Sequence, residues 1–152
     1  ETQKVATLLV SEVRGIKTTH ALVLALNGEL GTGKTTFVQG FSRAFGVKDR
    51  ITSPTFVLMK VYALSQKTNA KRRTPNTNFR HLVHIDCYRI ERADELMHLG
   101  LDEILADQDA IVLVEWADRI EEVLPDDAIT LEFGHGKKPN ERTIKVSHRN
   151  ET

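Results

Sequence analysis

The sequence predicts an α/β fold in which a mixed central sheet lies between helices. Two continuous apolar runs, residues 21–26 and 110–115, are typical of strands that are buried on both faces. A helix with one apolar face is expected over residues 34–45, after the first of these strands. Residues 128–133 and 142–148 alternate between apolar and polar positions, which predicts a C-terminal β-hairpin. This hairpin makes the sheet mixed rather than purely parallel.

The remaining elements are expected, in chain order, as a helix over 2–14, strands over 56–62 and 82–86, and short helices over 92–99 and 117–123. Gly15 ends the first helix, and Leu124-Pro125 ends the last one. Residues 65–79 are polar and have no apolar period, so they predict a long loop.

Composition narrows the classes of function. The chain has 21 basic (Lys and Arg) and 21 acidic residues, and zero formal net charge argues against wrapping nucleic acid as its main role. Its single cysteine cannot form an internal disulfide. No apolar run approaches the roughly 18 residues of a membrane helix. We therefore expect one cytoplasmic domain over residues 1–152, without contact with a membrane.

A glycine-rich stretch with one lysine, GELGTGKTTF, follows the first buried strand. It contains the full phosphate-binding pattern Gly-x-x-x-x-Gly-Lys-Thr, and the amphipathic helix follows it as the pattern requires. Glycines let backbone N–H groups at the helix N-terminus surround a triphosphate. Lys34 would supply charge to the β- and γ-phosphates, and the Thr35 hydroxyl could ligate Mg²⁺. The predicted nucleotide-binding residues of this three-layer P-loop NTPase fold are Gly28, Gly31, Thr32, Gly33, Lys34, Thr35 and Thr36.

Two strands end in a carboxylate, which phosphoryl transfer needs near the metal ion or the attacking water. Asp86 ends the strand LVHID, and Glu115 ends AIVLVE, which resembles a Walker B strand. With Lys34 they are the candidate catalytic residues, and Glu115 joins Thr35 as a candidate metal ligand.

Two groups of polar residues allow two interpretations. Ser53 and Thr55 precede a strand and would either sense the γ-phosphate, as GTPase switch loops do, or form a simple proline turn. His84 and Asp86 would share one face of a strand while His81 points away. This arrangement favours a hydrogen-bonded structural histidine over a metal site.

Trp116 is expected either in the core or as an aromatic wall of the site, and Cys87 is expected to pack in the interior. A basic cluster lies in and beside the 65–79 loop. It would either be solvated or contact a phosphate backbone, and its members are Lys67, Lys71, Arg72, Arg73 and Arg80.

The chain resembles the TsaE (YjeE) family, the small ATPase of bacterial tRNA threonylcarbamoyladenosine (t6A) biosynthesis, in an ordered set of motifs. These are GELGTGKTTF, SPTF, HIDCYRI, DELMHLGLDE and LVEWADRI. The resemblance runs from the N-terminal ETQKVA to about Pro125. Arg142, in the C-terminal hairpin, lies near the place of a family arginine.

The resemblance implies ATP and Mg²⁺ as ligands, with Thr35 and Glu115 holding the metal ion and Asp86 supporting the metal or the attacking water. Trp116 matches the family's Glu-Trp pair, although the proline usual after this pair is Ala117 here. Family members bind TsaB and TsaD, and ATP hydrolysis is thought to reset the complex between rounds of t6A37 formation. The resemblance thus predicts a Mg²⁺-dependent ATPase, slow alone and stimulated by its partners, that meets tRNA directly or through the complex.

The same residues allow other classes of function. A small-molecule P-loop kinase would need an acceptor pocket and a lid, which Arg72, Arg73 and Arg80 would imitate, although the loop shows no apolar anchors. A nucleotide-dependent binding module with negligible hydrolysis overlaps with the slow ATPase. The base-reading segment N-K-x-D is absent, which disfavours a GTPase.

Overall fold

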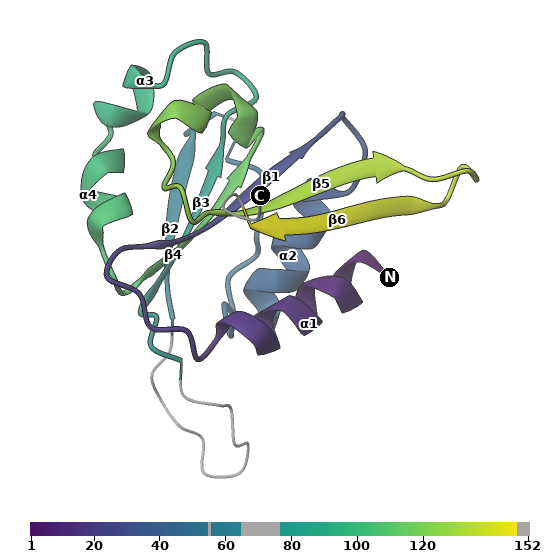
Figure 1. Cartoon of the computed structure of the whole chain (residues 1–152), viewed down its shortest axis with the longest axis horizontal. Helices are drawn as coiled ribbons and strands as arrows, with labels where there is room; N and C mark the ends of the chain where they lie inside the picture. Colours follow the sequence, from purple (N-terminus) through teal and green to yellow (C-terminus); the bar gives the residue numbers. More distant parts are fainter. Residues whose placement is uncertain (55, 65–76, 149–152) are drawn as a thin grey trace.

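The computed structural model describes residues 1–54, 56–64 and 77–148 and contains a six-stranded sheet with helices on both faces (Figure 1). The strands are β1 (Leu22–Gly28), β2 (Met59–Ala63), β3 (His81–Asp86), β4 (Ala110–Glu115), β5 (Ile129–His135) and β6 (Arg142–His148). The helices are α1 (Thr2–Val13), α2 (Lys34–Ala44), α3 (Asp94–Met97), α4 (Leu101–Ala106) and the 3₁₀ helix η1 (Ala117–Val123).

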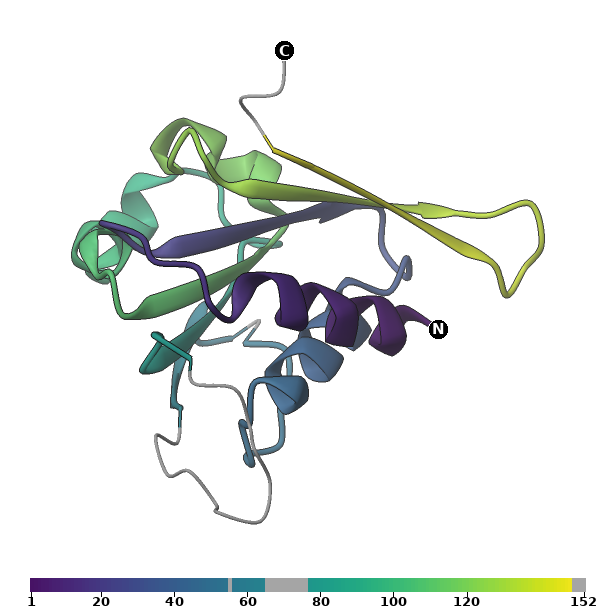
Figure 2. The ribbon, with the colours of Figure 1, turned by 60° about the horizontal axis from the view of Figure 1, so that its bottom comes forward.

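The sheet is mixed, as predicted. Its strand order is β2-β3-β4-β1-β5-β6. The four central strands are parallel, and each edge strand pairs antiparallel with its neighbour. The hairpin predicted at the end of the chain is β5–β6, and its far end projects beyond the rest of the sheet (Figure 2).

The three layers follow from the alternation of side chains along the central strands. One face of the sheet packs against α1 and α2, and its core includes Leu24, Leu113 and Phe41. The other face packs against α3, α4 and η1. All six residues of β4 are buried, because this strand has helices on both sides and a strand at each edge.

Helix α1 lies directly against α2 at a glycine. A Cβ atom placed on Gly40 would lie 3.0–3.1 Å from atoms of Gln3, closer than side chains normally approach. The absence of a side chain at Gly40 therefore lets the first turn of α1 pack closely against α2. Figure 2 shows the two helices running side by side below the sheet.

Two elements differ from the sequence prediction. The strand expected over 56–62 begins only at Met59, because the N–H groups of Val57 and Leu58 both donate to the carbonyl of Pro54 and close a turn. Leu58 takes a left-handed conformation (φ 64°) in this turn, and periodicity carries no signal for such a conformation. The helix expected over 92–99 is the shorter α3. The helix α4, which was not predicted, follows it after Gly100.

The ends of the predicted 65–79 loop are fixed by apolar side chains, which corrects the expectation that it has no apolar anchors. Phe79 is fully buried and contacts Phe45 edge to face, at 6.1 Å between ring centroids. Leu64 is also buried, and its N–H donates to the carbonyl of Arg80. Residues 65–76, with Lys67, Lys71, Arg72 and Arg73, lie outside the described residues.

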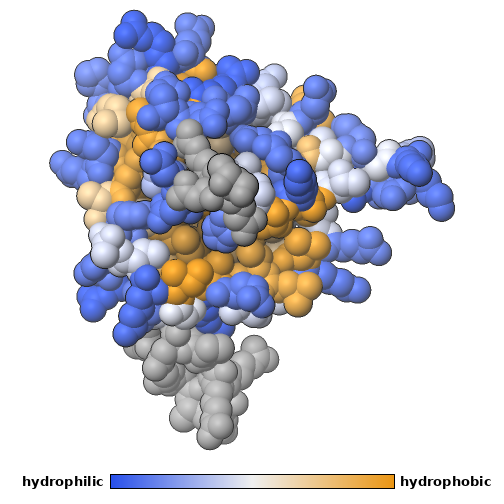
Figure 3. All heavy atoms as spheres, viewed as in Figure 1, coloured by the Kyte–Doolittle hydropathy of each residue, from blue (hydrophilic) through white to orange (hydrophobic). Residues whose placement is uncertain are grey.

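Hydrophobic residues on the face shown in Figure 3 gather around α1 and the part of the sheet next to it, whereas the projecting end of the β5–β6 hairpin is hydrophilic. Leu8 on α1 is 68% exposed. Among the described residues, no helix is both long enough and apolar enough to cross a bilayer.

Phe41→Ala should lower the free energy of unfolding by about 3–5 kcal/mol. Phe41 is fully buried on α2 and stacks between Phe37 and Phe45, with centroids at 5.8 and 5.2 Å, so its removal leaves a cavity. Urea denaturation followed by circular dichroism measures the change. Leu8→Ala, on the exposed side of α1, is the control and should cost less than about 0.5 kcal/mol. Equal losses of unfolding free energy in the two variants would contradict the assignment of Phe41 to the core and of Leu8 to the surface.

Candidate functional site

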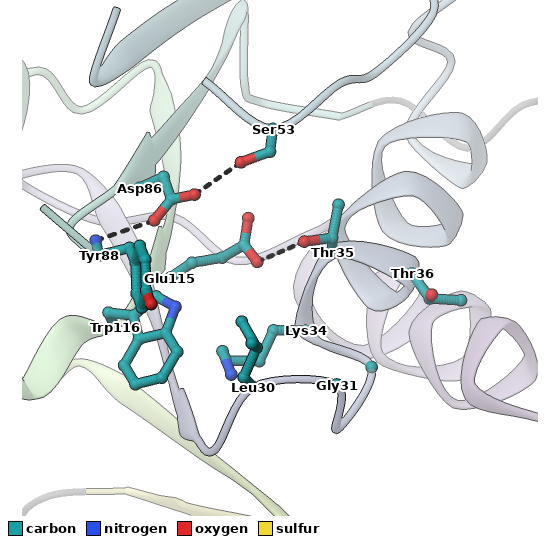
Figure 4. A pocket seen from close by; sticks show the side chains of 11 residues that line it. Leu30, Gly31, Lys34, Thr35, Thr36, Ser53, Asp86, Tyr88, Glu115 and Trp116 are labelled. Atoms are coloured by element: carbon teal, nitrogen blue, oxygen red, sulfur yellow. Dashed lines mark hydrogen bonds between the residues drawn. The ribbon is translucent and has the colours of Figure 1, made fainter. Parts of the chain in front are cut away.

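The carboxyl ends of three parallel strands bring the predicted site residues to one edge of the sheet. In the register of the sheet, Glu115 lies opposite Leu26 of β1 on one side and Asp86 of β3 on the other. The phosphate-binding loop follows β1 and leads into α2. A cavity of about 400 Å³ opens here (Figure 4). It is lined by Leu30, Gly31, Gly33, Lys34, Thr35, Thr36, Ser53, Asp86, Tyr88, Glu115 and Trp116.

The glycines of the loop are needed for reasons that the motif alone does not reveal. Gly28 was predicted to leave room for phosphates, and the structure shows that it also has a packing role. A Cβ on Gly28 would collide with the backbone of Phe133 in β5. Gly33 precedes α2 with φ 101°, a left-handed conformation that opens the helix N-terminus toward the loop.

The ammonium group of Lys34 lies inside the loop and is nearly buried, with 5% of the residue exposed. Its Nζ donates to the carbonyl oxygens of Gly28 (2.5 Å) and Glu29 (2.8 Å). Burial lowers the pKa of Lys34, while the carboxylates of Glu115 and Asp86 act in the opposite direction. The site therefore places one cation and two carboxylates, all three buried, around one cavity.

The two acids have different partners, as Figure 4 shows. Glu115 Oε1 accepts a hydrogen bond from the Thr35 hydroxyl at 2.7 Å, so the strand β4 and the helix α2 are joined at this point. Asp86 Oδ2 accepts from the Ser53 hydroxyl at 2.6 Å, and Oδ1 accepts from the Tyr88 N–H at 2.9 Å. Of the two residues predicted for a switch-like segment, Ser53 thus contacts the site, whereas Thr55 lies outside the described residues.

Trp116 forms one wall of the cavity, which decides between the two interpretations of this residue. Its ring lies 4.3 Å from Lys34 Nζ and 5.1 Å from the Tyr88 ring, both measured to ring centroids. Trp116 has φ 56°, an uncommon conformation for a large side chain. Tyr88 and Leu30 also line the cavity. The motif had given Tyr88 no role, and nothing in the sequence pointed to Leu30.

The other predicted residues lie around the loop. Thr32 donates its hydroxyl to the carbonyl of Glu29 at 2.7 Å, within the loop itself. Thr36 lies away from Asp86 and Glu115, across the first turn of α2 (Figure 4). Arg142 reaches the loop from the hairpin, because its Nε donates to the carbonyl of Gly31 at 3.2 Å.

The two histidines of β3 have separate partners. His84 is fully buried and bonds to Glu115, whereas His81 is half-exposed and lies 3.5 Å from a carboxylate oxygen of Asp107. In the described parts of the chain, no group of three or more His, Cys, Asp or Glu side chains is arranged to hold a metal ion. The prediction that His84 is a hydrogen-bonded histidine is confirmed.

Cys87, next to Asp86, should resist alkylation while the chain is folded. Its side chain is fully buried, and burial raises the pKa of the thiol to about 12, so the reactive thiolate is scarce at mildly alkaline pH. Mass spectrometry after iodoacetamide treatment should find labelling that is slow in buffer and fast in concentrated guanidinium chloride. Equal rates in the two solutions would show that the thiol is accessible in the folded chain.

Comparison with known proteins places the chain in a family. The sequence model described as "Threonylcarbamoyl adenosine biosynthesis protein TsaE" matches residues 1–144. A tRNA threonylcarbamoyladenosine biosynthesis protein TsaE from Bacillus subtilis (strain 168) is 41% identical over 109 residues, which cover 72% of this chain and 59% of that protein. The protein of the same name from Streptomyces coelicolor is 36% identical over 110 residues, which cover 72% of this chain and 66% of that protein.

The fold is also similar to a solved structure. The crystal structure of YdiB from Bacillus subtilis superimposes with a TM-score of 0.68 at 31% sequence identity, and it covers 98% of this chain and 79% of that one. The chain spans less than two thirds of the length of the two TsaE proteins above. The chain belongs to the TsaE family.

Proposed function

We propose that this chain binds and hydrolyses ATP as part of the bacterial machinery that makes t6A37 on tRNA, acting with TsaB and TsaD. The observation that carries the proposal is the hydrogen bond from Thr35 to Glu115, which joins the phosphate-binding loop to the acid at the end of β4. A hydroxyl at the helix start and a carboxylate beside it form the usual protein contribution to a Mg²⁺–nucleotide site.

The loop is suited to hold phosphates. Backbone N–H groups at the start of α2 and the dipole of this helix favour an anion. Lys34 adds a positive charge that desolvation makes more effective, because the surrounding low-dielectric space screens it weakly. The ring of Trp116 lies against this ammonium group and keeps one side of the cavity apolar. The Gly-x-x-x-x-Gly-Lys-Thr pattern of this loop is typical of loops that bind nucleoside triphosphates.

The donor set also fits Mg²⁺. This ion is usually held by one or two carboxylates together with phosphate oxygens and water, rather than by a cage of protein ligands alone. Thr35 and Glu115 would hold it, with Asp86 beside them, which agrees with the small number of acids at this edge of the sheet. When bound, the ion would neutralise charge that develops on the phosphates.

Asp86 is the candidate to orient the attacking water. The Ser53 hydroxyl and the Tyr88 N–H hold its carboxylate in place at the cavity wall. Ser53 belongs to the segment that leads into the turn at Pro54, so movement of this segment would reach Asp86 directly. This contact supports a switch-like role for Ser53. Thr55 is proposed as its neighbour in the same role on the basis of the sequence alone.

Membership of the TsaE family and the names of its relatives support the role in t6A formation. Turnover by the chain alone is proposed to be slow. Arg142, which contacts the loop, donates to three carbonyl oxygens, those of Gly31, Pro139 and Glu141. A guanidinium held in this way would not stabilise the transferring phosphate without rearrangement, so a partner that completes the site would accelerate the reaction.

Lys34→Ala should weaken ATP binding by about ten- to a hundredfold, because hydrogen bonds to charged groups contribute about 1.5–3 kcal/mol. Isothermal titration calorimetry measures the affinity. Lys48→Ala removes an exposed lysine beyond the end of α2 and serves as the matched control, whose affinity should equal that of the wild type. An unchanged ATP affinity in Lys34→Ala would contradict the assignment of the phosphate site to this loop.

Glu115→Gln should leave most of the ATP affinity intact but lower Mg²⁺-dependent turnover by more than about tenfold, since the side chain keeps its size and loses its charge. Turnover is measured for wild type and variant, alone and with TsaB and TsaD from the same organism. The proposal expects strong stimulation of the wild type by the partners and little in the variant. Unstimulated turnover that instead rises with a small phosphate acceptor would favour a small-molecule kinase.

A further inference from the structure

A buried histidine holds the carboxylate that faces the phosphate-binding loop. His84 lies in the middle of β3, and Glu115 ends the neighbouring strand β4. The distance from His84 Nε2 to Glu115 Oε2 is 2.6 Å, and the two side chains are 0% and 3% exposed. Since Oε1 of the same carboxylate accepts from Thr35, both oxygens of Glu115 are fixed, one from the core and one from α2.

The surroundings of the ring decide which nitrogen carries the hydrogen. Nδ1 of His84 is buried and has no hydrogen-bond partner among the described residues. A hydrogen on Nδ1 would point into the core without an acceptor, whereas a hydrogen on Nε2 points at a carboxylate oxygen. The hydrogen therefore belongs on Nε2, and His84 is the donor of this bond.

A fixed hydrogen-bond donor limits the rotamers that the Glu115 side chain can adopt. A glutamate side chain has three rotatable bonds, and at the end of a strand beside a cavity it would sample several rotamers. A short hydrogen bond from a ring that is packed inside the sheet selects one of them. Carboxylates that ligate metal ions are commonly oriented by such a second hydrogen bond, and its loss costs about 10–100-fold in metal affinity or activity.

We propose that His84 is a positioning residue for the ATPase site: its Nε2–H fixes the carboxylate of Glu115 in the orientation that meets Thr35. This inference rests on the proposed function, because the oriented carboxylate matters for Mg²⁺–ATP. His84 acts through Glu115 and lies outside the lining of the cavity. Within the described part of the chain, His84 is the residue that donates to Glu115 Oε2.

The first measurement detects the hydrogen bond between His84 and Glu115 in the absence of nucleotide and metal ion. A long-range ¹H–¹⁵N spectrum of the imidazoles, assigned with His84→Phe, should show His84 with its hydrogen on Nε2. Glu115→Ala should shift the Nε2 resonance of this ring. The control is His81, in the same strand but half-exposed, whose resonances should not move. A hydrogen found on Nδ1, or no response of Nε2 to Glu115→Ala, would overturn the inference.

The second measurement compares turnover in three variants. His84→Phe keeps a ring of similar size without a donor and should lower kcat and raise the half-saturating Mg²⁺ concentration by about ten- to a hundredfold, with ATP affinity nearly unchanged. His84→Gln returns an N–H near the position of Nε2 and should restore most of the loss. His81→Phe should behave as the wild type.

A double variant separates positioning from packing. If His84 acts through Glu115, then His84→Phe should cause no further loss of kcat in the Glu115→Ala background. Independent, multiplicative losses would overturn the inference, as would a His84→Gln variant as inactive as His84→Phe despite an unchanged melting temperature. If the wild type turns over ATP and His84→Phe does so equally, only this inference fails. If the wild type neither binds nor hydrolyses ATP, the proposed function fails, and the role of His84 in it fails too.

Discussion

The site depends first on the parallel, in-register pairing of β1, β4 and β3. The chain leaves β1 through α2 toward one side of the sheet and leaves β4 through η1 toward the other, and these two helices cover opposite faces. A crevice forms at the carboxyl ends of parallel strands where the connections diverge in this way, and ligands of open α/β sheets bind there. Glu115 occupies this point, between the loop after β1 and Asp86 of β3.

Burying charged side chains at this edge of the sheet lowers the stability of the fold, and hydrogen bonds offset this loss. Lys34, Asp86 and Glu115 are all buried, and an unpaired buried charge would destabilise the fold strongly. Each is instead satisfied by a local partner, namely loop carbonyls for Lys34, Ser53 and Tyr88 for Asp86, and Thr35 and His84 for Glu115. The left-handed backbone of Trp116 is a further local strain, and such strain persists where the surrounding structure enforces it.

The phosphate-binding loop is shaped by both ends of the chain as well as by its own sequence. Phe133 of β5 packs against Gly28, and Arg142 of β6 bonds to Gly31. Thr2 at the start of α1 lies beside Gly33, where a Cβ would come within 3.7 Å of its hydroxyl. The N-terminal helix and the C-terminal hairpin therefore contact the same short loop. Contacts from elements distant in sequence therefore add to the local constraints on the loop.

The sequence by itself determined most of the helices and strands, the loop motif and the strand-end acids, because apolar periodicity and glycine placement are local properties of a chain. It also placed His84 in a hydrogen bond, without identifying the partner. Only the tertiary structure decided the turn that delays β2, the burial of Phe79, the contact of Gly28 with β5, and the bonds that join His84, Ser53 and Thr35 to the acids. The β2 turn is local, closed by hydrogen bonds from Val57 and Leu58 to Pro54, but it needs a left-handed Leu58 that apolar periodicity does not indicate. The other contacts link residues distant in sequence, and they follow from strand register and layer packing, which a one-dimensional pattern does not encode.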